Sequence, residues 1–220
     1  MRHAFTRQRL WRLTPDAFQA ATRLLARAAR DHLGEVRLVV GVGTGGSLPA
    51  YAIGTQVDAR VVIVTAKHDT SGEIACDLGS LQALSRVEPL TGPFLVVGDI
   101  CGSGATLAAV TAALRSLAEP RSMIRTAALC RHTDAEDGVP DLYVWDVADW
   151  VVFPWEYPPA KQPTSPLPLP MQVRTTCHPS TAESSPERRH AVMLPIRAGA
   201  GRPTSEREPR ADEPRPERAR

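Results

Sequence analysis

The 220-residue chain is poor in lysine and in aromatic side chains, and its cysteines show no recognisable pattern. Only two of its 26 basic residues are lysine, and aromatic residues make up 5% of the sequence. The four cysteines form no CxxC pair, which argues against a zinc-type site and gives no disulfide framework. No stretch approaches the roughly 18 apolar residues of a membrane span, and the first residues lack the apolar core of a signal peptide. We therefore expect a cytoplasmic protein with no membrane partner.

Charge and proline divide the chain into two parts. Residues 1–157 carry 15 basic and 17 acidic side chains, whereas residues 158–220 carry 11 and 7. The first part lacks the clustered positive charge that phosphate-backbone binding needs, so we expect no nucleic-acid partner. The second part holds 13 of the 20 prolines and no apolar run that could offset the entropy of ordering it. We predict a folded domain over 1–157 and a disordered tail over 158–220, which is a solvated spacer or a segment that binds a polyanion.

Helices and strands are predicted to alternate along the first part. Thr14, Pro15 and Asp16 form a typical helix start, and Gly34 is a typical helix end. Apolar runs predict strands at 36–42, 60–65, 94–97, 124–130 and 142–147, and further helices are expected at 47–54 and 105–117. This order predicts an α/β fold with a mostly parallel sheet flanked by helices. Residues 67–92 have no clean period, which is typical of a lid or of a partly disordered loop.

The most informative segment is FLVVGDICGSGATL, residues 94–107. An apolar strand ends near Asp99, and a glycine-rich turn at residues 102–106 then opens a helix. Glycines let backbone amides converge, the hydroxyls of Ser103 and Thr106 add donors, and the helix dipole favours negative charge. The segment therefore predicts an anion site at the carboxyl edge of the sheet, where such folds bind ligands. It is neither a Walker loop nor a GxGxxG turn.

This pattern resembles the phosphoribosyl-pyrophosphate (PRPP) motif of type I phosphoribosyltransferases. The resemblance implies that residues 102–106 hold the 5-phosphate and that Asp99 is the catalytic acid, holding the ribose hydroxyls and Mg²⁺. A second segment, VGTGGSLP at 42–49, resembles the pyrophosphate loop of the family, although a plain strand-to-helix junction would also need its glycines. The implied PRPP contacts are Thr44, Gly45, Gly46, Asp99, Ile100, Cys101, Gly102, Ser103, Gly104, Ala105 and Thr106.

A third segment, DWVVFPWE at 149–156, resembles the base-binding segment of xanthine-guanine phosphoribosyltransferases. In that family a Lys 19 residues before the first Trp meets the purine 6-oxo group, and Arg131 stands at this spacing. The alternative is that Trp150 and Trp155 only close the core. The implied base contacts are Arg131, Trp150, Val151 and Glu156. The resemblance further implies Mg²⁺ as cofactor, a role in purine salvage and self-association into a homo-oligomer.

Three positions depart from the family pattern. Gly98 stands where a first acid precedes Asp99, Thr44 replaces a cation in the pyrophosphate loop, and Gly102 replaces an Asp that faces the imidazole side of a purine. Lys67 and His68 are either diphosphate contacts or ordinary polar residues. We predict transfer of 5-phosphoribosyl from PRPP to a purine-like base with release of pyrophosphate. The alternatives are a non-catalytic PRPP- or nucleotide-binding regulatory module and another sugar-phosphate enzyme, such as a lyase or hydrolase.

Overall fold

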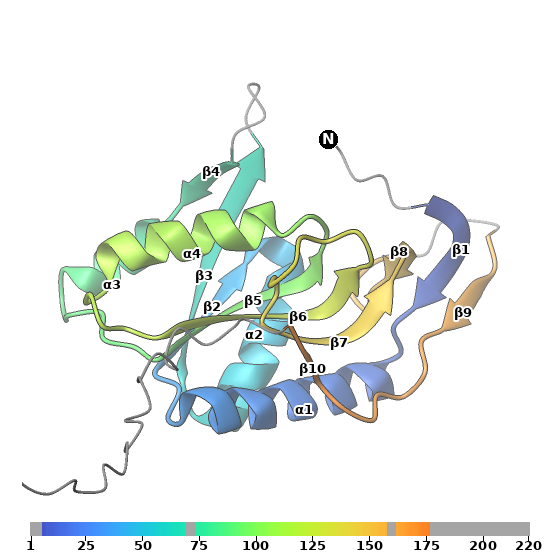
Figure 1. Ribbon diagram of the computed structural model, residues 1–220, viewed down its shortest axis with the longest axis horizontal. Helices are drawn as coiled ribbons and strands as arrows, with labels where there is room; N and C mark the ends of the chain where they lie inside the picture. Colours follow the sequence, from blue (N-terminus) through green and yellow to red (C-terminus); the bar gives the residue numbers. More distant parts are fainter. Residues whose placement is uncertain (1–5, 69–73, 158–161, 177–220) are drawn as a thin grey trace, which may run out of the picture. The chain divides into compact units, whose positions relative to one another are not determined.

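Residues 6–68, 74–157 and 162–176 are described in this computed structural model, and they form two sheets and four helices (Figure 1). The seven-stranded sheet has the order β10-β7-β6-β5-β2-β3-β4, and the three-stranded sheet has the order β8-β1-β9. The strands are β1 (Thr6–Arg12), β2 (Leu38–Val42), β3 (Arg60–His68), β4 (Ile74–Asp77), β5 (Phe94–Cys101), β6 (Ile124–His132), β7 (Leu142–Val147), β8 (Asp149–Val152), β9 (Thr164–Pro166) and β10 (Arg174–Thr175). The helices are α1 (Pro15–Leu33), α2 (Gly43–Val57), α3 (Gly79–Ser85) and α4 (Ala105–Leu117).

The central strands of the large sheet are parallel and confirm the predicted α/β architecture. Strands β2, β3, β5, β6 and β7 pair in parallel, while β4 and β10 are antiparallel strands at the two edges. From β2 the chain moves to β3 on one side, and it later continues from β5 to β7 on the other. The strand order therefore reverses between β2 and β5, and ligands of such folds bind in the crevice beyond the carboxyl ends at this point.

Helices cover both faces of the sheet, with α1 and α2 on one face and α3 and α4 on the other (Figure 1). Neighbouring residues of the central strands enter opposite core layers: Val39, Leu95 and Val97 pack in the first, whereas Val40 and Val96 pack in the second. Burial on both faces explains why these strands are continuous apolar runs. Each such side chain contributes about 1.5–3 kcal/mol when it leaves water.

Helix α1 begins and ends where its sequence signals predict. The Thr14 hydroxyl accepts a hydrogen bond from the Ala17 amide at 3.2 Å, and Pro15 is the first helical residue. Gly34 closes the helix with a φ of 71°, a conformation in which glycine has no side-chain penalty. The cap contributes about 1 kcal/mol and fixes the register in which the apolar side of α1 meets the sheet. No helix among the described residues is long and apolar enough to span a lipid bilayer.

The segment predicted to lack regular structure, residues 67–92, contains two strands and a helix, so that part of the prediction was wrong, while a role as a lid stays a prediction. Strand β3 continues to His68 and pairs with β4 as an antiparallel hairpin, with Ala66 opposite Cys76. Helix α3 follows, and its Leu81 is fully buried in the second core layer. The short apolar alternation of β4 and the single buried leucine of α3 were too weak to stand out in the sequence. The tip of the hairpin, residues 69–73, lies outside the described residues.

The folded domain extends beyond residue 157, so the predicted boundary was placed too early. Strand β9 adds to β1, and β10 adds to β7. Leu167 is buried, and Trp145 Nε1 donates a hydrogen bond to the Pro168 carbonyl at 3.1 Å. Proline is compatible with such edge positions because they do not require every amide to donate, and an apolar run is not needed to hold them. The rest of the predicted tail, residues 177–220, lies outside the described residues, and its disorder stays a prediction.

Candidate functional site

The two glycine-rich segments meet at the reversal point of the sheet. Strands β2 and β5 pair directly, with Gly41 opposite Val97, and both run toward the same edge. Helix α2 begins at Gly43 immediately after β2, so the helix predicted over 47–54 starts four residues earlier than expected. Helix α4 begins at Ala105, as predicted. Neither helix has a side-chain cap or an acidic residue in its first turn, which leaves two positive helix ends facing the crevice.

The glycines at the start of α2 allow the helix to contact β5 directly. A Cβ atom on Gly45 would overlap Oδ2 and Cγ of Asp99 and lie 2.9 Å from Oδ1. A Cβ atom on Gly46 would lie 2.6 Å from the Val97 carbonyl oxygen. Only glycine therefore fits at position 46 without moving the β5 backbone, and at position 45 without moving the Asp99 side chain. The close contact places the Asp99 carboxylate against the first turn of α2, next to the segment that resembles a pyrophosphate loop.

Asp99 is a partly buried acid in an environment that opposes its charge. Burial raises its pKa, the hydrogen bond that Oδ1 accepts from the Ile100 amide at 2.8 Å lowers it, and the charge of Glu156 raises it further. The net result is a raised pKa. A carboxylate in this position gains more than an exposed one from a cation or a hydroxyl donor. The influence of Glu156 also shows that the end of the 149–156 segment lies near Asp99.

The phosphate-type loop, residues 102–106, is supported from one side by another loop. Gly104 has a φ of 95°, and a Cβ atom there would lie 3.1 Å from the Val139 side chain. The Ser103 carbonyl accepts a hydrogen bond from the Glu136 amide at 3.2 Å, and the Ser103 hydroxyl accepts one from the Ala105 amide at 3.3 Å. A Cβ atom on Gly102 would meet nothing within 4 Å. The loop is therefore fixed on its Gly104 side and open around Gly102.

The aromatic segment 149–156 is divided between the core and the surface. Trp155 stacks on Phe153 with ring centroids 5.1 Å apart, and its ring meets that of Phe18 edge to face at 5.6 Å. Trp155 thus closes the core, which is the alternative considered for the two tryptophans. Trp150 lies on β8 and remains 37% exposed, while its neighbour Val151 is buried. Of this pair, the Trp150 indole is accessible to a ligand and the Val151 side chain belongs to the core.

Arg131 lies at the predicted place in the chain, but its guanidinium is bound elsewhere than we expected. Its Nε donates to the Val139 carbonyl at 3.1 Å, and its Nη2 donates to the Ala135 carbonyl at 2.9 Å and to the Glu136 carbonyl at 3.3 Å. Nη1 lies 3.8 Å from Asp146 Oδ1. These contacts direct Arg131 into the loop that supports Gly104. In this arrangement its Nε and Nη2 donors are not presented to a base, in contrast to the predicted role.

Lys67 and His68, the candidate diphosphate contacts, lie on the β3–β4 hairpin. Lys67 is exposed on β3 opposite Ala75, and His68 is opposite Ile74. Residues 133–140, which support the phosphate-type loop, were missed by sequence reasoning. The run TDAEDGVP directly after β6 was the available signal, since its acids and glycine mark a turn at the carboxyl edge of the sheet. Nothing local in it indicates a contact with Gly104.

A separate cleft of about 300 Å³ lies at the opposite edge of the sheet. It is lined by the amino ends of β2, β3 and β5 and by the turn after α3, with Arg37, Arg60 and Glu88 among its charged residues. Arg60 and Glu88 form an ion pair with each other. Its mixed charges and its position away from both glycine-rich segments separate this cleft from the site around Asp99.

A family match and a related protein of known name both identify this chain as similar to phosphoribosyltransferases. Residues 13–162 match the family described as the phosphoribosyl transferase domain. The chain is 29% identical over 172 residues to the xanthine-guanine phosphoribosyltransferase of Gluconobacter oxydans (strain 621H), a match that covers 74% of this chain and 90% of that protein.

Solved structures with a similar fold include purine phosphoribosyltransferases. That of Pyrococcus horikoshii Ot3 has a TM-score of 0.58 and 24% identity and covers 70% of this chain and 98% of its own. The xanthine-guanine-hypoxanthine enzyme of Helicobacter pylori has a TM-score of 0.55 and 22% identity, with coverages of 67% and 93%. A hypothetical protein from Neisseria gonorrhoeae with bound ppGpp has a TM-score of 0.54 and 18% identity, with coverages of 70% and 92%. At these identities the structures establish the fold alone.

Proposed function

This chain belongs to the phosphoribosyl transferase domain family, and on that premise we propose that it transfers the 5-phosphoribosyl group of PRPP to a 6-oxopurine and releases pyrophosphate. The observation that carries the proposal is the position of Asp99. Its carboxylate lies against Gly45, between the start of α2 and the turn that leads into α4. An acid flanked by two uncapped helix ends suits a ribose that carries phosphate groups on both sides.

The 5-phosphate is assigned to residues 102–106 and the pyrophosphate to the first turn of α2. Gly104 holds its left-handed backbone next to Val139, so the amides that follow it are fixed before a ligand binds. At α2 the backbone amides of Thr44, Gly45 and Gly46 are the donors, because no cation stands at position 44. Fixed amides at a helix end stabilise a leaving diphosphate by preorganised electrostatics. We propose that these amides do the work that a cationic side chain does in other members.

The residues around Asp99 fit Mg²⁺ that arrives with PRPP. Within the described part of the chain, no cluster of three or more His, Cys, Asp or Glu side chains could hold a metal ion. Mg²⁺ does not need such a cluster, since it is commonly held by one or two carboxylates together with phosphate oxygens and water. Asp99 supplies one carboxylate. Its pKa is raised because the site disfavours an unpaired negative charge, and a bound cation would compensate that charge. When bound, the metal ion would neutralise charge on the diphosphate.

The transfer step asks the protein for positioning and charge stabilisation. The bond from ribose C1 to the pyrophosphate oxygen breaks while a ring nitrogen approaches the opposite face, and positive charge develops on the ribose. Asp99 stabilises that charge and orients the ribose hydroxyls, and the α2 amides stabilise the departing negative charge. The crevice at the sheet edge holds the three reacting parts in line.

The base is assigned to the 149–156 segment, on the side of the crevice where Trp150 and Glu156 lie. Trp150 presents a partly exposed indole, which suits stacking on a flat heterocycle. Glu156 Oε2 accepts a hydrogen bond from the Phe153 amide at 3.1 Å, which fixes the carboxylate near Asp99. A fixed carboxylate can accept hydrogen bonds from ring or exocyclic N–H groups of a purine. The regulatory alternative is not favoured, because the matched family and the curated relative are transferases.

The test is pyrophosphate release from Mg²⁺–PRPP in the presence of guanine, xanthine, hypoxanthine, adenine, uracil or orotate. We expect release with at least one of the three 6-oxopurines and none with the pyrimidines. The Asp99→Asn variant should lose this release, whereas Asp58→Asn, an acid at the far end of α2, should keep it. Pyrophosphate release that is independent of any base would instead identify a hydrolase, and binding of PRPP without release would support the regulatory alternative.

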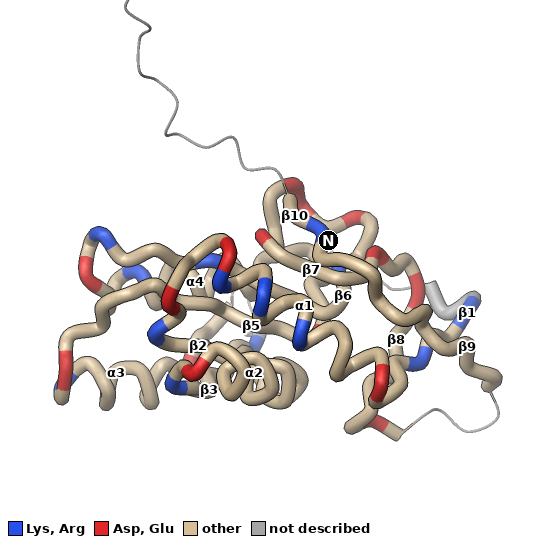
Figure 2. Tube along the Cα trace, turned by 90° about the horizontal axis from the view of Figure 1, so that it is seen from below, with Lys and Arg blue, Asp and Glu red and all other residues tan. Residues whose placement is uncertain are grey.

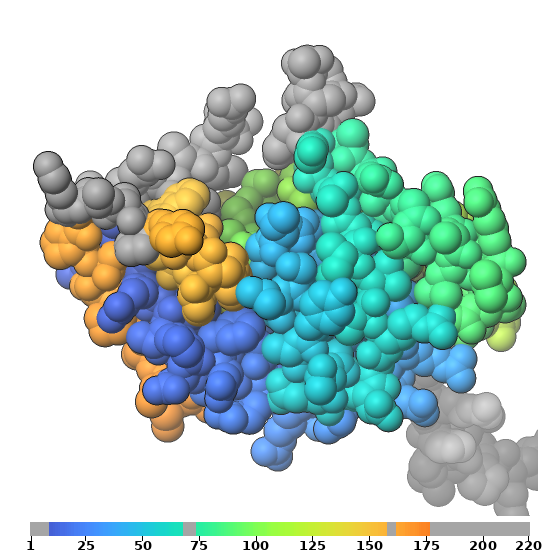
Figure 3. Space-filling model, turned by 180° about the vertical axis from the view of Figure 1, so that it is seen from behind, coloured from blue at the N-terminus to red at the C-terminus, as the bar shows by residue number. Residues whose placement is uncertain are grey.

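Self-association is proposed through the outer side of α2. This helix carries no charged residue, yet Leu48 is 47% exposed and Tyr51 is 53% exposed on it. Figure 3 shows residues 43–57 at the surface beside β3, and Figure 2 shows that charged positions are interspersed over the other elements. An uncharged helix face of this kind is suited to a symmetric contact with a second copy. Light scattering of wild type and Tyr51→Glu tests this, with a change from dimer to monomer expected.

A further inference from the structure

The proposed transfer must move one proton away from the acceptor ring, and the inference that follows rests on that proposed function. A ring nitrogen that forms a bond to C1 must lose its hydrogen, and a carboxylate within reach of the ring is suited to accept it. Asp99 is engaged on the ribose side, with Oδ1 bonded to the Ile100 amide and Oδ2 against Gly45. Glu156 is assigned to hydrogen bonds from the base near Asp99. On the other side, beside the phosphate-type loop, Gly102 leaves an open space where another carboxylate is suited to take this proton.

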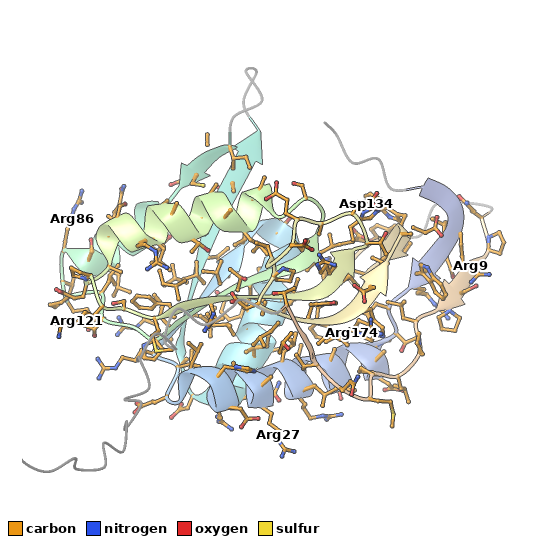
Figure 4. All side chains as sticks on the ribbon, viewed as in Figure 1. Arg9, Arg27, Arg86, Arg121, Asp134 and Arg174 are labelled. Atoms are coloured by element: carbon orange, nitrogen blue, oxygen red, sulfur yellow. The ribbon has the colours of Figure 1, made fainter. Side chains whose placement is uncertain are left out.

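The connection between β6 and β7, residues 133–140, occupies that position. On one side the Glu136 amide donates to the Ser103 carbonyl of the phosphate-type loop at 3.2 Å. On the other side the Thr133 amide donates to the Val147 carbonyl at 3.0 Å, at the end of β7. Figure 4 shows Asp134, near the start of this connection, between α4 and β8. The 133–140 loop therefore joins the segment assigned to phosphate and the segment assigned to the base.

A buried histidine strengthens the second of these contacts. His132 Nδ1 accepts a hydrogen bond from the Asp134 amide at 3.1 Å, so the proton of a neutral ring lies on Nε2. Nε2 is 3.2 Å from the Ala148 carbonyl and donates to it. Ala148 directly precedes β8, which carries Trp150. The start of the 133–140 loop is thus attached to the beginning of the base segment.

The middle of the same loop is held rigidly by Arg131. The guanidinium donates to the carbonyls of Ala135, Glu136 and Val139, and the Val139 side chain packs against Gly104. Hydrogen bonds from a charged donor are the stronger class, so the backbone of Glu136 is well fixed. Its side chain is exposed, and its backbone amide borders the phosphate-type loop at Ser103.

The charge of Glu136 has an electrostatic effect on the residue that precedes the phosphate-type loop. Burial raises the pKa of Cys101, the thiol directly before Gly102; the charge of Arg131 lowers it, and the negative charge of Glu136 raises it further. The space around position 102 is open, since a Cβ atom there would meet nothing within 4 Å. Gly102 itself contributes no side chain to this space.

We propose that Glu136 is a catalytic base that accepts the proton of the acceptor heterocycle. The C1–oxygen bond breaks and both of its electrons leave with pyrophosphate. An electron pair of the ring forms the new C1–nitrogen bond, the ring N–H bond gives its electrons back to the heterocycle, and the proton moves to a Glu136 oxygen. Glu136 returns that proton to water when the product leaves. Arg131 acts in this step as a positioning residue, since it holds the loop that carries Glu136.

The test compares full-length Glu136→Gln with Asp137→Asn, which removes one exposed carboxylate from the neighbouring residue of the same loop. General-base catalysis contributes about 10²–10⁴-fold, so kcat of Glu136→Gln should fall by at least about 100-fold. Its KM for PRPP and its calorimetric affinity for PRPP should stay at wild-type values. Asp137→Asn should keep the wild-type kcat. Glu136→Asp should recover part of the loss.

A second variant separates chemistry from folding and from simple charge effects. Adding Gly102→Asp to Glu136→Gln places a carboxylate in the open space of the turn, and we expect part of kcat to return. Equal losses in Glu136→Gln and Asp137→Asn, or a loss that lies in the KM for PRPP, would overturn the catalytic role. A wild-type chain without transfer would refute the proposed function itself. Wild-type transfer together with a fully active Glu136→Gln would refute only this inference.

Discussion

The Asp99 carboxylate occupies the space that a side chain at position 45 would need. A Cβ atom on Gly45 would overlap Oδ2, so the first turn of α2 and the end of β5 are fitted to each other at this point. The same contact sets the acid between two uncapped helix ends. Glycine at position 45 is therefore a requirement of the site and not only of the local backbone.

Replacing this glycine tests the relationship directly. Gly45→Ala should displace Asp99 and lower kcat/KM for PRPP by at least tenfold, since the carboxylate must move to make room. Overpacking of this kind costs typically about 1–3 kcal/mol, so the free energy of unfolding should fall by that amount. Thr55→Ala, on an exposed part of the same helix, should leave both quantities unchanged. Wild-type kinetics for Gly45→Ala would show that the contact has no bearing on the site.

The raised pKa of Asp99 gives a prediction for stability against pH. Because the folded-state pKa lies above the ordinary value, folding favours the protonated form more than the unfolded chain does, and ionisation of Asp99 opposes folding. Asp99→Asn should therefore be inactive but at least as stable as wild type at neutral pH. The difference in Tm should shrink as the pH falls through the raised pKa toward about 3.9, the ordinary value for Asp. Thermal unfolding between pH 3 and 8 measures it, and a variant less stable than wild type at pH 7 would contradict the assignment.

A substitution of Arg131 distinguishes two possible roles of this side chain, because each role affects a different KM. If it holds the 133–140 loop, Arg131→Gln should raise the KM for PRPP and lower the free energy of unfolding by about 2 kcal/mol, because three carbonyls of the loop lose a charged donor. If it contacts the base, the KM for the base should rise instead. We expect the first result, given the three carbonyl contacts. Arg27→Gln, at an exposed position of α1, is the control and should leave both KM values and the free energy of unfolding unchanged.

The two tryptophans of the 149–156 segment should respond differently to truncation. Trp155→Ala removes a ring stacked on Phe153 and should cost about 3–5 kcal/mol of stability. Trp150→Ala should change the free energy of unfolding much less, because the ring is partly exposed, and should raise the KM for the base about tenfold. Chemical denaturation measures the free energy of unfolding of both variants, and initial rates measure their KM for the base. A base KM that is unaffected by Trp150→Ala would remove Trp150 from the base site.

The sequence predicted the elements whose signals are local. Thr14, Pro15 and Gly34 mark α1 correctly, and the apolar run into Asp99 locates both β5 and the turn that follows it. The edge strands were not predictable, since β9 and β10 are short and rich in proline or charge and exist only by pairing with β1 and β7. Their stability comes from partners distant in the sequence, which periodicity does not record.

In the candidate site, too, local signals were predictable from the sequence and contacts between distant segments were not. Gly45 and Asp99 were recognised separately, but their contact depends on the pairing of β2 with β5. For Arg131 the spacing gave the right position on β6, whereas the direction of the guanidinium depends on carbonyl groups of the following turn. Glu136 was missed because it follows no family motif and acquires its place through a backbone hydrogen bond to Ser103.

The most direct measurement is chromatographic detection of the nucleotide product. Full-length protein is incubated with Mg²⁺–PRPP and guanine, xanthine or hypoxanthine, and both the nucleoside 5′-monophosphate and pyrophosphate are quantified. Phosphoribosyl transfer predicts equal amounts of the two products with at least one of these bases, and neither product with Asp99→Asn. Pyrophosphate without nucleotide, or PRPP left intact with every base, would contradict the central claim.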